Sequence, residues 1–148
     1  MAAIIQGTTT GLKYLVLTGE LNFGVAQTYK IALYTDAADL SPGNTNVVYD
    51  TTNEVTGAGY TAGGKDLVVA APGFSFDPVV GWVSFGPVSW TSATFTARGA
   101  AIYRNTGGNG NKYVVAILDF GSNKTVDNGT FNITFPEDTA TGAIIRFE

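Results

Sequence analysis

Residues 59–65, Gly-Tyr-Thr-Ala-Gly-Gly-Lys, have the spacing of a phosphate-binding loop, G-x-x-x-x-G-K. Such a loop needs a Ser or Thr hydroxyl after the lysine to bind magnesium, and a helix N-terminus that faces the phosphates. In this chain Asp66 follows the lysine, and its carboxylate would repel a phosphate. The next residues, Leu-Val-Val-Ala-Ala-Pro, indicate a strand rather than a helix. We therefore interpret residues 59–65 as a glycine-rich turn and expect no nucleotide there.

Four carboxylates in one loop-rich region are the next candidates for chemistry. Asp36 and Asp39 lie three residues apart in the sequence, and Asp50 and Glu54 lie four apart. They do not form the D-x-D-x-D-G string of a calcium loop. A glycosidase would need two of them about 5–9.5 Å apart across a cleft. Acidic loop residues are mostly solvated and favour turns, so a hydrolase that uses only carboxylates is our third hypothesis.

The chain lacks two residue types on which many catalytic and metal sites depend. Its 148 residues include no His and no Cys. This excludes a Ser-His-Asp triad, an imidazole acid–base catalyst, a disulfide, a thiolate zinc site and a thiol nucleophile. The composition therefore favours a protein that is not an enzyme, and we expect no metal and no cofactor.

The charge pattern also limits the partners. The net charge is −4, from 8 basic and 12 acidic side chains, and the basic residues are scattered singly. Nucleic-acid binders usually carry a basic stripe, so we expect no nucleic-acid partner. Charged residues make up 14% of the chain, against about 25% in an average domain, which favours close contact with other proteins. No secretory signal and no apolar run of the ~20 residues of a membrane helix is evident, so we expect a soluble protein.

Alternation of apolar and polar residues, bounded by Gly, Pro and Asn, predicts strands. Residues 130–135, Thr-Phe-Asn-Ile-Thr-Phe, place their apolar side chains on one face. Apolar runs that favour buried strands occur at 30–34, 66–71, 79–85, 112–120 and 143–147. About eight strands with frequent turns predict an all-β fold, a two-sheet antiparallel β-sandwich of jelly-roll type. We expect residues 1–148 to form a single domain with a short N-terminal arm over about residues 1–10.

Two segments near the N-terminus allow alternative interpretations. Leu12, Leu15 and Val16 have helical spacing and predict a short helix within residues 11–21, with a strand as the alternative. Ile4 and Ile5 precede a polar stretch, residues 6–11. This uncharged arm either adds a strand to the sheet edge of another subunit or docks on its own domain.

Several segments have a distinctive order: 29–35 (YKIALYT), 52–65 (TNEVTGAGYTAGGK), 101–105 (AIYRN), 118–121 (LDFG) and 129–135 (GTFNITF). Over about residues 12–136, this order resembles a recurring pattern in small virion proteins of tailed bacteriophages, and residues 54–65 are its most specific part. The resemblance implies a capsid decoration (cement) protein with a jelly-roll-like β-sandwich. It implies no cofactor and no catalytic residue.

From this resemblance we expect a protein that binds the outside of the assembled phage head and bridges major-capsid subunits. It would associate with itself as a homodimer or homotrimer, have no membrane partner, and be made in the host bacterial cytoplasm. A protein that binds only the assembled lattice would stabilise that lattice by about 2.7 kcal/mol per site when the free protein concentration is a hundredfold above Kd. The alternative is a tail or head-fibre component that binds a receptor or carbohydrate through Trp82 or Trp90.

Three parts of the chain are predicted to contact other proteins. They are the N-terminal arm, the turn at residues 107–111, whose glycines favour a protruding hairpin tip, and the Thr-, Asn- and Gly-rich excursion over residues 38–64. The predicted interface residues are Ile4, Ile5, Asn53, Glu54, Tyr60, Arg104, Asn109 and Lys112.

Overall fold

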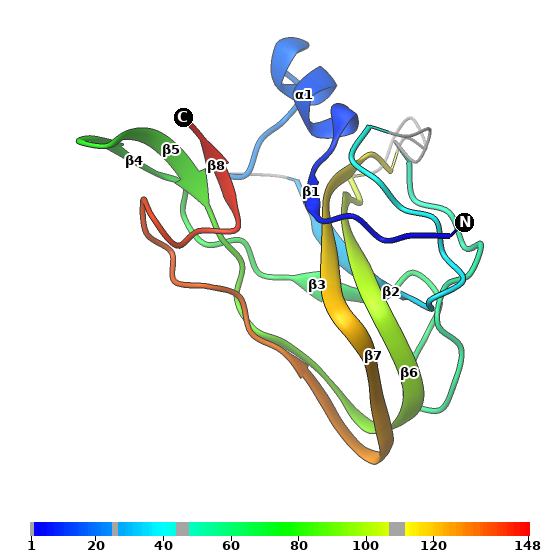
Figure 1. The fold of residues 1–148 in the computed structure, drawn as a ribbon. Coiled ribbons are helices and arrows are strands. Elements are labelled where there is room, and N and C mark those ends of the chain that lie inside the picture. Colours follow the sequence, from blue (N-terminus) through cyan, green and yellow to red (C-terminus); the bar gives the residue numbers. More distant parts are fainter. Residues whose placement is uncertain (1, 25–26, 44–47, 107–111) are drawn as a thin grey trace.

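In the computed structural model, which describes residues 2–24, 27–43, 48–106 and 112–148, the chain consists mainly of β-strands (Figure 1). The strands are β1 (Gly7–Thr8), β2 (Tyr29–Tyr34), β3 (Lys65–Leu67), β4 (Gly73–Phe76), β5 (Val79–Val83), β6 (Val88–Arg104), β7 (Val114–Ile133) and β8 (Ile145–Phe147). Within the described residues they form a five-stranded sheet, in the order β1-β7-β6-β2-β3, and a three-stranded sheet, in the order β4-β5-β8. Every strand pair in both sheets is antiparallel.

The prediction of an all-β fold with two antiparallel sheets and one short helix is confirmed, and the jelly-roll arrangement stays a prediction. Some predicted boundaries are wrong. The run 66–71 contributes only to the three-residue β3, and the runs 112–120 and 130–135 belong to one 20-residue strand, β7. The long excursion is confirmed, since the described part of the chain has no named strand or helix between β2 and β3.

The long hairpin of β6 and β7 organises the molecule, and it bends sharply partway along its length (Figure 1). Ala97 pairs with Lys124 and Gly99 pairs with Asp119, so a single residue of β6 lies opposite residues 120–123 of β7. Extra residues on one strand bend it and increase its local twist. Gly121, with a φ of 76°, supplies the left-handed conformation that this bulge requires. The sharp bend comes further along, where the register between residues 90–95 of β6 and 126–131 of β7 is irregular and Ser92 and Asn128 have φ values of 48° and 45°. This bend divides β7 into two limbs that lie at an angle to each other (Figure 1).

The predicted N-terminal helix is confirmed as α1 (Thr10–Leu17), which lies at one end of the five-stranded sheet (Figure 1). Thr9 caps it, because the backbone N–H of Leu12 donates to the Thr9 hydroxyl at 3.1 Å. The side chains of Leu12 and Leu15 are fully buried and attach the helix to the core. In the described residues no helix is long and apolar enough to cross a membrane.

One hydrophobic core joins the two sheets. Tyr29 and Ile102 from the five-stranded sheet belong to the same buried cluster as Val83 and Ile145 from the three-stranded sheet. This shared core gives the fold its sandwich character, because each sheet buries an apolar face against the other.

The N-terminal arm docks on its own domain, which is the second of the two predicted alternatives. The backbone N–H of Ile5 donates to the carbonyl of Leu40 at 2.8 Å, and the N–H of Leu40 donates to Ala3 at 2.8 Å. Ile4 is 7% exposed and lies in a buried cluster with Leu40. The prediction of Ile4 as an anchor in another subunit is therefore wrong in this structure, whereas Ile5 remains 53% exposed.

Candidate functional site

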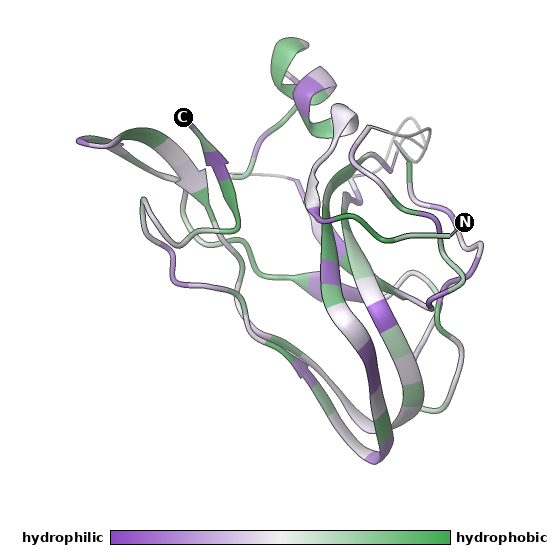
Figure 2. Cartoon of the chain, viewed as in Figure 1, coloured by the Kyte–Doolittle hydropathy of each residue, from purple (hydrophilic) through white to green (hydrophobic). Residues whose placement is uncertain are grey.

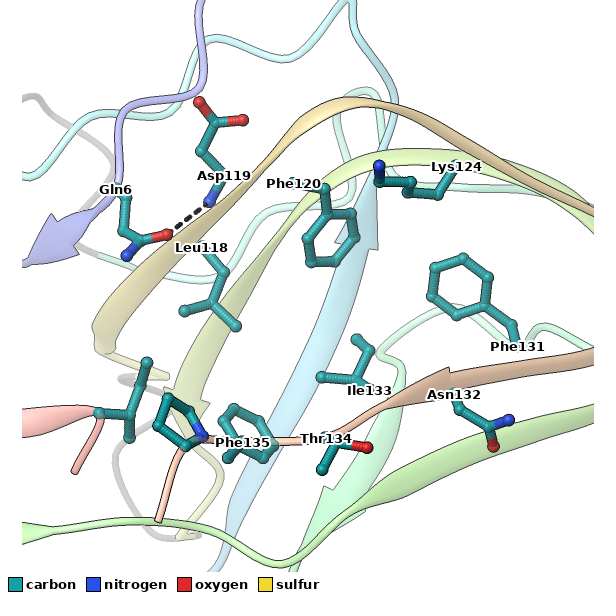
Figure 3. A pocket seen from close by; sticks show the side chains of 12 residues that line it. Gln6, Leu118, Asp119, Phe120, Lys124, Phe131, Asn132, Ile133, Thr134 and Phe135 are labelled. Carbon is teal, nitrogen blue, oxygen red and sulfur yellow. Dashed lines mark hydrogen bonds between the residues drawn. The ribbon is translucent and has the colours of Figure 1, made fainter. Parts of the chain in front are cut away.

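An open groove of about 520 Å³ lies in the bend of the β6–β7 hairpin (Figure 3). One limb of β7 contributes Leu118 and Phe120, and the other contributes Phe131 and Ile133. In Figure 3 the side chain of Leu118 points from the first limb towards Ile133 and Phe135. Two limbs of one bent strand therefore form an apolar concave surface.

The remaining lining residues close the end of the groove and surround it with polar groups. Pro136 and Ile144 add further apolar surface, and the polar lining residues are Gln6, Asp119, Lys124, Asn132 and Thr134. The backbone N–H of Asp119 donates to Gln6 Oε1 at 3.3 Å, and the Asp119 carboxylate forms an ion pair with Arg98. Lys124 Nζ donates to the Ser122 hydroxyl at 3.0 Å. These charged rim groups are engaged with other protein groups, so the groove is built for apolar binding.

Glu54 occupies a different and buried environment. The hydroxyls of Tyr49 and Tyr60 each donate to its carboxylate at 2.6 Å, and the backbone N–H of Gly63 donates at 2.7 Å. Only 7% of Glu54 is exposed. The predictions of Glu54 as a solvated acid and as a surface contact are therefore wrong, because its oxygens accept hydrogen bonds from within the domain.

The tyrosines around Glu54 connect the long excursion to the sheet. Tyr60 also accepts a hydrogen bond from the backbone N–H of Leu33 in β2, and Tyr103 of β6 donates to the carbonyl of Gly63 at 2.7 Å. Burial is the main cause that raises the pKa of the Tyr60 and Tyr49 hydroxyls above the ordinary value, and their hydrogen bonds to Glu54 raise it further. The cluster keeps these hydroxyls protonated as donors, which is a structural role.

The glycine-rich segment at residues 59–65 forms a turn that leads into strand β3, as predicted. Gly64 has a φ of 72°, and a Cβ atom there would lie 1.8 Å from the carbonyl oxygen of Ile31. The glycine is needed because the turn passes directly against β2. The spacing of the glycines in residues 59–65 thus reflects close backbone packing.

The other three acidic candidates are exposed, as expected. Asp36 accepts a hydrogen bond from Asn123 at 3.0 Å. Asp39 and Asp50 line a separate pocket of about 240 Å³. Hydrogen bonds from Thr52 lower the pKa of the Asp50 carboxyl below its ordinary value. Glu54 points into the tyrosine cluster and does not line this pocket, so the four acids do not form one site.

The other predicted interface residues lie in several environments. Asn53 is exposed and its amide donates to the carbonyl of Ala37 at 3.0 Å. Arg104 is half-buried and forms an ion pair with Glu20 at 3.6 Å. Lys112 is exposed, with its ammonium 5.4 Å from the centre of the Tyr49 ring. Asn109 and the rest of the turn at 107–111 lie outside the described residues.

The two tryptophans differ in exposure. Trp90 is 1% exposed and packs in the core, so it offers no surface for a sugar ring. Trp82 is half-buried and lines a shallow hollow of about 220 Å³ together with Leu21, Phe23 and Phe147. The lining residues of this hollow are apolar, whereas sugar sites combine an aromatic platform with hydrogen-bonding groups.

A second apolar surface, which the sequence analysis missed, lies on the β4–β5 hairpin. Phe74, Phe76 and Val79 are 72%, 83% and 77% exposed. Figure 2 shows hydrophobic residues along this projecting hairpin. The signal was the alternation Gly-Phe-Ser-Phe at residues 73–76, which places both phenylalanines on one face.

Comparisons of the chain with protein-family models, with curated proteins and with solved structures find no match.

Proposed function

We propose that this chain is a virion structural protein of a tailed bacteriophage, a capsid decoration (cement) protein that binds the outside of the assembled head and bridges major-capsid subunits. The observation that supports it best is the apolar groove between the two limbs of β7. A groove lined by Leu, Ile and Phe side chains binds by shape and apolar contact, which is the chemistry of a protein that holds other chains together.

The proposed occupant is an extended apolar segment of the major capsid protein. Strand β1 pairs only with Ala116 and Ile117 of β7. From Leu118 onwards, the described residues include no strand on this edge of β7. Two amides of this edge are already bound, because the N–H of Asp119 donates to Gln6 and the N–H of Gly121 donates to the Asp119 carboxylate. The apolar lining of the groove, which selects the side chains of an extended peptide, therefore supports this occupant more than the strand edge does.

Stabilisation of the head follows from mass action. A protein that binds the assembled lattice and not the separate subunits shifts the equilibrium towards the lattice at every occupied site. A decoration protein that contacts two capsid subunits at once gains avidity, because the second contact forms at a high effective concentration. Weak individual contacts are therefore sufficient when they repeat over the whole head.

Substitution in the groove tests the proposal. Thr134 lines the groove and is exposed, so Thr134→Arg introduces a long charged side chain there without removing core packing. Thr130→Arg is the matched control, because Thr130 is also exposed on the same part of the chain and does not line the groove. Both variants are incubated with purified undecorated heads, and the bound fraction is measured after sedimentation.

We expect wild type and Thr130→Arg to sediment with the heads and Thr134→Arg to bind at least about tenfold more weakly, the effect of about 1.4 kcal/mol. Circular dichroism shows whether both variants are folded. Equal binding of Thr134→Arg and wild type would overturn the groove as the binding site. No binding of wild type to heads would overturn the cement function.

A further inference from the structure

The three-stranded sheet has an apolar face that extends beyond the core. The register pairs Phe76 with Val79, and Gly81 with both Phe74 and Phe147. Paired residues of neighbouring strands lie on the same face of a sheet, so these side chains share one face. Phe74, Phe76 and Val79 are each more than 70% exposed and Phe147 is 46% exposed. Such a contiguous apolar surface marks an interaction site.

Within the described residues, β4 is one of the two outer strands of this sheet, and β8 is the other. Strand β4 pairs through its four residues with β5 in a continuous register, without a bulge. It contains no Lys and no Pro, the residues that commonly protect a sheet edge from pairing with another chain. The β4 edge is therefore an open template for a further strand.

The charge distribution indicates which kind of strand is suited to pair with the β4 edge. From residue 67 to residue 97 the only charged side chain is Asp77, at the tip of the β4–β5 hairpin. A second copy of this surface meets no like charge along the strand. When two copies of β4 pair antiparallel, the two Asp77 carboxylates lie at opposite ends of the pair.

We infer that β4 pairs antiparallel with β4 of a second copy, which makes the chain a two-fold symmetric dimer. Antiparallel pairing of a strand with itself is self-complementary about a two-fold axis. The two three-stranded sheets become one continuous sheet across the axis. Phe74 and Phe76 of one copy lie beside those of the other, and such cross-strand aromatic pairs stabilise a sheet.

This inference is independent of the groove. It depends only on the geometry and charge of the three-stranded sheet. It also gives the dimer two grooves, one in each copy, which is what a bridge between two capsid subunits requires.

A lysine on the edge strand tests the dimer. Phe76→Lys adds a charge at a side chain that is 83% exposed, and Leu17→Lys on α1, where Leu17 is 87% exposed, is the matched control. Light scattering after size-exclusion chromatography gives the mass. We expect about twice the chain mass of 15.5 kDa for wild type and Leu17→Lys, and the single-chain mass for Phe76→Lys. A monomeric wild type, or a dimeric Phe76→Lys, would overturn the inference.

Cysteine crosslinking tests the strand pairing itself, because the native chain has no Cys. Single cysteines are placed at residues 74, 75 and 76, with Leu17→Cys as the control. Residue 73 is kept as Gly, because a Cβ atom there would lie 2.4 Å from the Trp82 ring. Antiparallel pairing predicts disulfide-linked dimers that peak at one or two of these positions, where the Cα atoms approach within about 7 Å across the axis. Crosslinking that is equal at all positions, or absent, would overturn the pairing. Thr134→Arg leaves the dimer intact, so failure of the groove and failure of the dimer are distinguishable.

Discussion

The hydroxyl of Tyr60 donates to the carboxylate of Glu54 at 2.6 Å, and both groups belong to the excursion that precedes β3. Because Tyr60 also accepts from the backbone N–H of Leu33 in β2, this pair ties the irregular segment to the five-stranded sheet. The excursion therefore has an internal polar anchor, in which a buried carboxylate is satisfied by hydroxyl and amide donors.

Replacement of this carboxylate is expected to destabilise the fold. In Glu54→Gln an amide NH₂ group replaces one of the two acceptor oxygens. This donor then faces a hydroxyl or N–H group that donates to the carboxylate in the wild type, so two donors oppose each other. We expect a loss of about 1–3 kcal/mol in the free energy of unfolding, measured by urea denaturation. Glu137→Gln, at an exposed position, is the control and should change it by less than about 0.5 kcal/mol. Equal stabilities of the two variants would contradict the anchor.

The N-terminal arm offers a second test through two neighbouring residues of the same type. Ile4 is buried against Gly99, where an added Cβ would lie 2.9 Å from two Ile4 carbon atoms, whereas Ile5 is 53% exposed. We expect Ile4→Ala to lower the free energy of unfolding by about 2–5 kcal/mol. Ile5→Ala should change it by less than about 0.5 kcal/mol. Similar effects of both substitutions would show that the arm does not dock as described.

Alkaline pH is expected to unfold the protein through its buried tyrosines. Burial is the largest cause that raises the pKa of five tyrosines above the ordinary value near 10: Tyr29, Tyr34, Tyr49, Tyr60 and Tyr103. The unfolded chain loses these protons at a lower pH than the folded chain does. Their contribution to stability is therefore present below about pH 10 and is lost as the pH rises above it.

Urea denaturation at a series of pH values above about 9 measures this effect. Each such tyrosine contributes a slope of about 1.4 kcal/mol per pH unit between its unfolded and folded pKa. Tyr60→Phe removes one of these groups and is expected to have a shallower slope than wild type. A wild-type stability that is constant up to about pH 11, or an unchanged slope in Tyr60→Phe, would contradict the buried cluster.

The sequence predicted the elements of the groove but not the groove itself. The alternation at residues 130–135 correctly placed Phe131 and Ile133 on one face, and both side chains line the groove. Its other wall, with Leu118, comes from the opposite limb of the same strand. The bend that brings the limbs together lies where the register between residues 90–95 of β6 and 126–131 of β7 is irregular, and local alternation does not encode this non-local register.

Exposure was harder to predict than secondary structure. Glu54 is an acidic residue in a polar loop, and only the folded positions of Tyr49 and Tyr60 make its burial favourable. The exposed Phe74 and Phe76 have a strand pattern, but their exposure depends on how far the second sheet extends beyond the core. Both properties arise from packing between elements, which the spacing of residues along the chain does not specify.

Imaging of phage heads after incubation with the purified wild-type chain tests the central claim most directly. Undecorated heads are mixed with an excess of the protein and examined by electron cryomicroscopy. The account predicts added density on the outer surface of the heads at regular lattice positions, with each bound copy of the protein in contact with more than one capsid subunit. Heads whose outer surface is unchanged at saturating protein would contradict it.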